Sequence, residues 1–209
     1  MTLQQIKEYN NAGARCVQCG MIKESWVLFK GALELHLALE KAKSNTSHSF
    51  SRTAIIYIQQ AETRYQLFQT LDLENFDVHD GAPAHKSSHL SLCKTPRVVK
   101  NGDDSYGIGV TVIFNLALVE HWKNPSSPQV LSMYALALSL SGPFKEPHLK
   151  AATLNNAGIW YFENGDVGSA KSCFERAMKL SVGSDRSSRE RAVSNLRWIS
   201  MHYRTSPAA

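Results

Sequence analysis

Two cysteines near the amino terminus have the spacing of a metal or redox site. Cys16-Val-Gln-Cys19 is a C-x-x-C pair, and thiolates at this spacing bind zinc or exchange disulfides. A zinc site needs a second pair of Cys or His, whereas Cys93 and Cys173 each stand alone. A redox pair needs a strand and a helix start, but this pair lies near the end of a predicted helix. We therefore expect reduced thiols, with Cys16 in the core as a small apolar side chain.

A second group of possible metal ligands lies in the middle of the chain, and consists of His79, Asp80, His85 and His89. Imidazole and carboxylate groups are common ligands of divalent metals. The stretch around them is polar and contains glycine, and histidines occur in such loops without a role. We favour the interpretation without a metal, and expect no cofactor.

Motifs of catalysis do not occur in this sequence. There is no G-x-S-x-G, no phosphate-binding P-loop, no G-x-G-x-x-G followed by a helix and no H-E-x-x-H. The pair Gly107-Ile-Gly109 is too short to bind a dinucleotide. The sequence favours a protein that is not an enzyme.

Composition is that of a folded protein with a mild positive charge. Of the 209 residues, 43% are apolar and 20% are charged, and the formal net charge is +5. This length suits a single domain over residues 1–209. The start, MTLQQIKEYNNAG, lacks the apolar core of a signal peptide, and no run of 18 apolar residues occurs. We expect a cytoplasmic or nuclear protein that makes no contact with a membrane.

An internal repeat carries most of the structural information. Residues 10–35 align without a gap on residues 155–180, and eight of the 26 positions are identical. The shared residues are the Asn-Asn-Ala-Gly opening and a later Gly, Phe, Ala and Leu. These are small and large residues at spacings that two packed helices require.

The shared glycine, phenylalanine and alanine residues each have a structural reason. Gly13 and Gly158 fall inside a predicted first helix, where glycine costs about 1 kcal/mol unless a neighbouring helix approaches closely. Gly20 and Gly165 fall at the turn between helices, where a left-handed backbone is favourable. The large and small side chains that follow fill each other's space, and are Phe29, Ala32, Phe174 and Ala177.

Residues 13–32 and 158–177 resemble the tetratricopeptide repeat, a helical hairpin of about 34 residues with an A-x3-F signature. A third copy at residues 112–140 carries Asn115-Leu116-Ala117, followed by Tyr134, Ala137 and Leu140. Positions where the family has Trp hold Tyr9 and Leu154, and the proline that often closes a repeat is absent.

The resemblance implies an all-α fold, an α-solenoid of antiparallel helical hairpins with a long irregular insertion and a C-terminal capping helix. The expected hairpins span residues 3–43, 110–141 and 147–181. The expected helices within them are 3–19, 22–43, 110–123, 128–141, 147–163 and 166–181. A further helix is predicted over 50–71, the insertion over 73–109 and a basic capping helix over 187–204. Within the insertion, HLSLCKTPRVV alternates weakly and is predicted to be extended.

In proteins that resemble this one, the first helix of each hairpin lines a concave groove that binds a partner. The residues that the resemblance places there are Lys7, Asn10, Asn11, Phe114, Asn115, Asn155 and Asn156. Asparagine amides both donate and accept hydrogen bonds, and so can hold the backbone of an extended peptide. The alternative is that asparagine is merely a frequent residue of the motif. The lysines of chaperone-binding relatives are replaced by Thr111 and Ala152, so their carboxylate clamp looks absent.

These features predict a non-catalytic scaffold or adaptor that binds another protein through a peptide or helix. The alternative is a helical-repeat protein that binds nucleic acid through basic residues, Arg186, Arg189, Arg191, Arg197 and Arg204 among them. A third possibility is a metal or enzymatic function in the insertion. If residues 73–109 fill the groove, the binding site is blocked or self-regulated.

Overall fold

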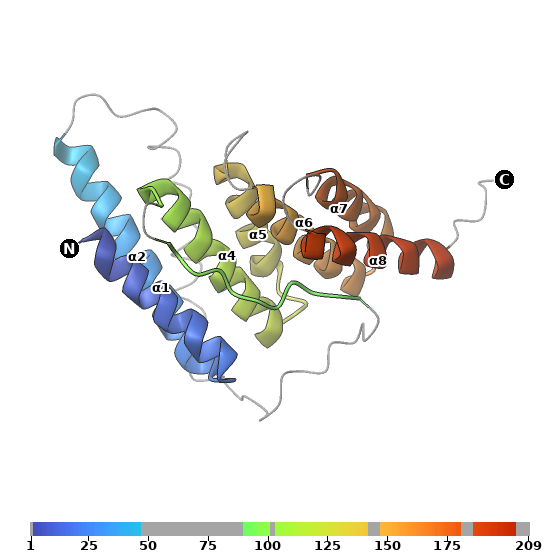
Figure 1. Ribbon diagram of the computed structural model, residues 1–209, viewed down its shortest axis with the longest axis horizontal. Helices are drawn as coiled ribbons and strands as arrows, with labels where there is room; N and C mark the ends of the chain where they lie inside the picture. The colour runs from blue at the N-terminus through green and yellow to red at the C-terminus, as the bar shows by residue number, and fades with distance from the viewer. Residues whose placement is uncertain (1, 47–89, 101–102, 142–146, 181–185, 204–209) are drawn as a thin grey trace. The chain divides into compact units, whose positions relative to one another are not determined.

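The computed structural model describes residues 2–46, 90–100, 103–141, 147–180 and 186–203. These residues contain seven α-helices and no strand, which confirms the all-α class for the part of the chain that is described (Figure 1). The helices are α1 (Leu3–Gln18), α2 (Ile22–Thr46), α4 (Ser105–Lys123), α5 (Pro128–Leu140), α6 (Pro147–Glu163), α7 (Val167–Leu180) and α8 (Arg186–His202).

The predicted helix boundaries agree within three residues except at the start of α4. This helix begins at Ser105, five residues before the predicted start at 110, so the last part of the expected insertion is helical. Asp104 Oδ1 accepts from the backbone N–H of Gly107 at 2.7 Å and so caps the first turn. Gly107 and Gly109 belong to the predicted insertion and weaken helix propensity, but the helix forms with this capped first turn. The predicted helix 50–71 and the group His79, Asp80, His85 and His89 lie outside the described residues.

The chain divides into two compact units. Unit 1 comprises residues 1–81 and 97–116, and unit 2 comprises residues 82–96 and 117–209. Helix α4 and the segment 90–100 each contribute residues to both units.

In unit 1, α1 and α2 pack against each other. The Phe29 ring lies on Gly13, so that a Cβ built at Gly13 would come within 2.7 Å of Phe29 Cε1. The close approach predicted from the mid-helix glycine is thus confirmed. Gly20 has φ of +77°, and the Met21 N–H donates to Cys16 O at 2.8 Å, which closes the helix end as a Schellman turn.

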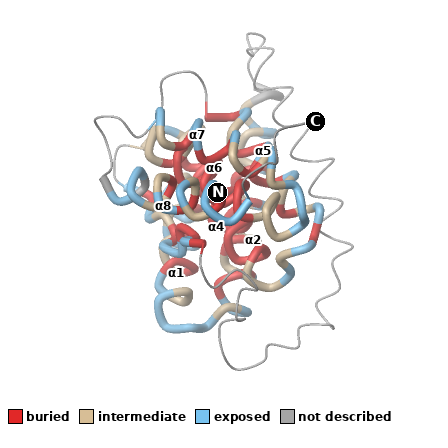
Figure 2. Tube along the Cα trace, turned by 90° about the vertical axis from the view of Figure 1, so that its right-hand side faces the viewer, coloured by how far each residue is buried: buried red, intermediate tan, exposed pale blue. Residues whose placement is uncertain are grey.

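Unit 2 repeats this arrangement with α6 and α7. Phe174 lies on Gly158, with 2.7 Å from its Cε1 to a Cβ built there, and Gly165 has φ of +88° at the turn. Helix α8 packs against α7 and α5 packs against α6. Residues 151–159 of α6 are all buried, so this helix is surrounded by other elements, as the red tube in Figure 2 indicates.

Among the described helices, none has the length and apolar character that crossing a membrane requires. The basic last helix buries Ala192 and Ile199, each at 0% exposure. Tyr203, which follows this helix, is 44% exposed.

Candidate peptide-binding site: asparagines on an extended segment

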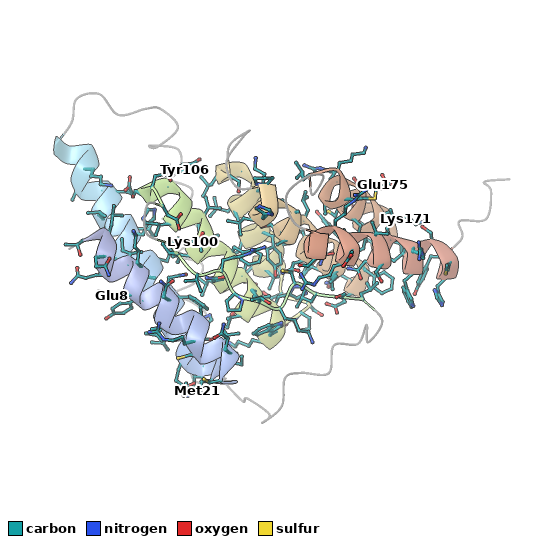
Figure 3. All side chains as sticks on the ribbon, viewed as in Figure 1. Glu8, Met21, Lys100, Tyr106, Lys171 and Glu175 are labelled. Carbon is teal, nitrogen blue, oxygen red and sulfur yellow. The ribbon has the colours of Figure 1, made fainter. Side chains whose placement is uncertain are left out.

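Residues 90–100 form a segment that is neither helix nor strand, and it follows an extended path (Figure 1). Its buried residues are Leu90, Leu92, Cys93, Pro96 and Val99, and its other side chains are exposed or half-buried. Figure 3 labels Lys100 at its carboxyl end. A segment without secondary structure must satisfy its backbone N–H and C=O groups elsewhere, and here asparagine side chains supply the partners.

In unit 1, two asparagines each hold both polar groups of one segment residue. The Val99 N–H donates to Asn11 Oδ1 at 2.8 Å, and Asn11 Nδ2 donates to Val99 O at 3.0 Å. The Arg97 N–H donates to Asn115 Oδ1 at 2.7 Å, and Asn115 Nδ2 donates to Arg97 O at 2.7 Å. A side-chain amide therefore pairs with a backbone residue as a neighbouring strand would.

A third asparagine joins these two. Asn10 Nδ2 donates to Arg97 O at 3.0 Å and to Asn11 Oδ1 at 3.2 Å, and its Oδ1 accepts from Asn115 Nδ2 at 2.9 Å. Asn10 and Asn115 are fully buried. We call Asn10, Asn11 and Asn115 the first asparagine triad.

Unit 2 contains a second asparagine triad, Asn155, Asn156 and Asn195, that reproduces the main pairings. The Cys93 N–H donates to Asn156 Oδ1 at 2.9 Å, and Asn156 Nδ2 donates to Cys93 O at 3.3 Å. The Ser91 N–H donates to Asn195 Oδ1 at 2.7 Å, and Asn195 Nδ2 donates to Ser91 O at 3.2 Å.

Asn155 has the joining role that Asn10 has in unit 1. Its Nδ2 donates to Ser91 O at 3.0 Å and to Asn156 Oδ1 at 3.4 Å, and its Oδ1 accepts from Asn195 Nδ2 at 3.0 Å. Every hydrogen bond of the first triad thus has a counterpart in the second. The same arrangement of three amides therefore occurs twice in the described residues.

The two triads have the same spacing and polarity. Each binds two residues that are two positions apart in the segment, Val99 with Arg97 and Cys93 with Ser91. In each unit the helix that comes earlier in the chain binds the later of the two segment residues. The groups of the segment that pair with the asparagines are all backbone N–H and C=O groups. The geometry therefore suits extended polypeptides of many different sequences.

The second triad continues into a buried polar network. Burial raises the pKa of the Tyr134 hydroxyl well above its usual value, an effect that its hydrogen bond with Asn156 partly opposes. Tyr134 also contacts His121 Nδ1 at 3.2 Å, and His121 Nε2 lies 3.2 Å from Glu163 Oε2. These contacts fix the orientation of Asn156.

Five of the residues predicted for the groove are in the triads: Asn10, Asn11, Asn115, Asn155 and Asn156. The other two are not brought to the segment. Lys7 is half-buried and, among the described residues, makes no hydrogen bond to it, whereas Phe114 has 0% exposure and belongs to the core. Thr111 and Ala152 are buried as well.

Asn195 is the site residue that the sequence prediction omitted. Its helix was predicted as a basic capping helix, whereas the structure buries the Asn195 amide on the inner face of this helix. The signal was present, because Asn195-Leu196 repeats the Asn115-Leu116 pair of the third copy.

The cysteine pair takes no part in the site. Cys16 is half-buried rather than in the core, Cys19 is exposed at the end of α1, and both thiols are free. Within the described residues, no group of three or more His, Cys, Asp or Glu side chains is arranged to hold a metal ion.

Comparison of the chain with protein-family models, with curated proteins and with solved structures finds no match.

Proposed function

We propose that this chain is a non-catalytic scaffold of tetratricopeptide-like solenoid type, whose asparagine triads bind an extended peptide of a partner protein by its backbone. The observation that carries the proposal is the repeated pairing of one amide side chain with the N–H and C=O of one residue. A packing role alone needs neither this pairing nor its repetition 145 positions along the chain, from Asn10 and Asn11 to Asn155 and Asn156.

The chemistry of the triads favours a polypeptide over a nucleic acid. Their side chains are neutral amides, which match peptide groups, whereas a phosphate backbone is bound mainly by Lys and Arg. The formal charge of +5 would bring an acidic partner closer without selecting it.

The segment also indicates which peptide would fit. Positions equivalent to Leu92, Cys93, Pro96 and Val99 would be buried, and those equivalent to Lys94, Thr95 and Val98 would face solvent. A partner peptide of this kind is extended, apolar at the buried positions and variable at the others.

The test uses the full chain with its own segment released. In the release variant Leu92→Asp/Val99→Asp, two buried apolar side chains are replaced by carboxylates, which are costly to bury. A labelled peptide with the sequence of residues 90–100 is then titrated by fluorescence anisotropy, and circular dichroism shows that the variant retains its helices.

Backbone recognition is tested with two N-methylated peptides. Methylation at the positions equivalent to Cys93 and Arg97 removes two N–H donors that pair with Asn156 and Asn115. Two hydrogen bonds of about 1 kcal/mol each predict a loss of affinity of about 30-fold. Methylation at the equivalents of Lys94 and Val98 is the matched control, and is expected to change affinity little. A folded release variant that binds no peptide, or equal losses for both methylated peptides, would contradict the proposal.

A further inference from the structure

The peptide-binding site is already occupied by a part of the same chain. Segment 90–100 presents backbone groups to both triads at the spacing described above. A contact made through peptide groups can be made equally well by a peptide from another molecule. The segment is therefore interchangeable with the ligand class that the site accepts.

The segment is held by its buried side chains and by hydrogen bonds of the triads to four of its residues. The triads bind the N–H and C=O groups of Ser91, Cys93, Arg97 and Val99, whereas the N–H groups of Lys94 and Val98 make no hydrogen bond in the described structure. Exposed backbone and few ladder-type hydrogen bonds are typical of segments that open below the free energy of global unfolding. Helix α6, buried over residues 151–159, is a rigid reference in the same unit.

The segment is tethered on both sides. In the sequence, 43 residues (47–89) separate it from the end of α2, and four residues (101–104) separate it from the start of α4. A competitor in the same chain acts at an effective concentration that its links set and that does not depend on the protein concentration. A peptide from a partner must therefore compete with a local occupant.

We infer that segment 90–100 is an internal competitor, which occupies both asparagine triads until a partner peptide with the same backbone spacing displaces it. This inference rests on the proposed function, since it assumes that the triads accept a peptide from another molecule. At each triad the partner needs the backbone groups of two residues that are two positions apart, as Arg97 and Val99 present them in unit 1 and Ser91 and Cys93 in unit 2.

The test compares the affinity of the labelled 90–100 peptide for three full-length proteins. They are the wild type, the release variant Leu92→Asp/Val99→Asp, and a control variant Thr95→Asp/Val98→Asp. Both variants gain two carboxylates, so their electrostatic attraction to a basic peptide is matched. Val98 is 52% exposed and Val99 is 4% exposed, so that only the release variant disturbs buried contacts.

The release variant is expected to bind the peptide at least about tenfold more tightly than the wild type. The apparent affinity is proportional to the fraction of protein whose site is open, and this fraction is larger in the release variant. The control variant is expected to bind like the wild type. Equal affinity of the wild type and the release variant would overturn the inference and leave the proposed function standing. Absence of binding to every protein, the release variant included, would overturn the proposed function itself.

Hydrogen exchange on the wild type gives a second measurement that does not depend on a variant. Saturation with the unlabelled peptide is expected to speed exchange at the amides of Ser91, Cys93, Arg97 and Val99 in the protein, and to leave those of α6 unchanged. Slow exchange of these four amides with the peptide bound would overturn the inference. So would a wild-type dimer that is lost in the release variant, because the occupant would then come from a second copy.

Discussion

Asn115 offers a sharp test of whether a triad asparagine acts as a paired donor and acceptor. The side chain is fully buried, and its Oδ1 and Nδ2 lie 2.7 Å from the N–H and the carbonyl oxygen of Arg97. Asn115→Ala removes both groups. Asn115→Asp has nearly the same shape and keeps the acceptor, but places an oxygen where Nδ2 donates to Arg97 O and to Asn10 Oδ1.

The two substitutions differ in expected size. Asn115→Ala loses two hydrogen bonds to the segment at about 1 kcal/mol each, so the segment should open about 30-fold more often. Asn115→Asp should cost about 3 kcal/mol or more at neutral pH, because a buried carboxylate then faces two oxygen atoms. The more conservative change in shape is thus expected to be the more damaging one.

The pH dependence separates the variants further. Burial and the facing oxygens raise the pKa of the introduced carboxyl above its value in the unfolded chain. The folded state therefore takes up a proton first as pH falls, and stability is regained as the pH drops through that raised pKa. The protonated group has one O–H donor and so restores part of the amide pairing. Asn115→Ala has no such group and should show no recovery.

The assay is residue-resolved hydrogen exchange at the Arg97 amide, corrected for the intrinsic effect of pH. At neutral pH, we expect exchange at this amide to be slowest in the wild type, faster in Asn115→Ala and fastest in Asn115→Asp. The difference between the two variants should become smaller in acid. If the Asp variant is protected like the wild type at neutral pH, Nδ2 of Asn115 is not a donor to the segment, and the proposed recognition is refuted.

Three other predictions concern the scaffold. In urea unfolding, Gly13→Ala should lower the free energy of unfolding by about 1–3 kcal/mol through overpacking on Phe29. Gly168→Ala is the control and should be neutral or stabilising, because a Cβ built there would meet only Asp166 Oδ1, at 3.6 Å. Gly165→Ala should lower the free energy of unfolding by about 1 kcal/mol through backbone strain alone, since φ is +88° and no atom lies within 4 Å of a Cβ built there. Gly165→Asn should lower it less. Burial lowers the pKa of His36 to about 4. The unfolded chain therefore takes up a proton first as the pH falls, and the free energy of unfolding should fall by up to about 3 kcal/mol from pH 6.5 to pH 4. A His36→Phe variant that keeps the same pH dependence would contradict this.

The helical scaffold could be predicted from the sequence because its determinants are local. Gly13 and Phe29, or Gly158 and Phe174, lie within 16 positions of each other, and their sizes specify how two consecutive helices approach. The start of α4 was misplaced because Gly107 and Gly109 weaken helix propensity, while the capping hydrogen bond from Gly107 to Asp104 supports the helix.

The site could be predicted only in part because its pairings are long-range. Asn11 binds a residue 88 positions away and Asn195 binds one 104 positions away. The recurring asparagine allowed two interpretations, an amide that holds an extended backbone or a frequent residue of the motif, and the periodicity of the helices carries no information on which backbone could be held. The weak alternation in residues 89–99 suggested only an extended segment, and nothing in it specifies the partners of its N–H groups.

The most direct test of the central claim is the exchange pattern along segment 90–100 in the wild-type chain. We expect slow exchange at the amides of Ser91, Cys93, Arg97 and Val99, and fast exchange at those of Lys94 and Val98, which make no hydrogen bond in the described structure. Uniformly fast exchange over all six amides would contradict it, because the asparagines would then not be binding this backbone.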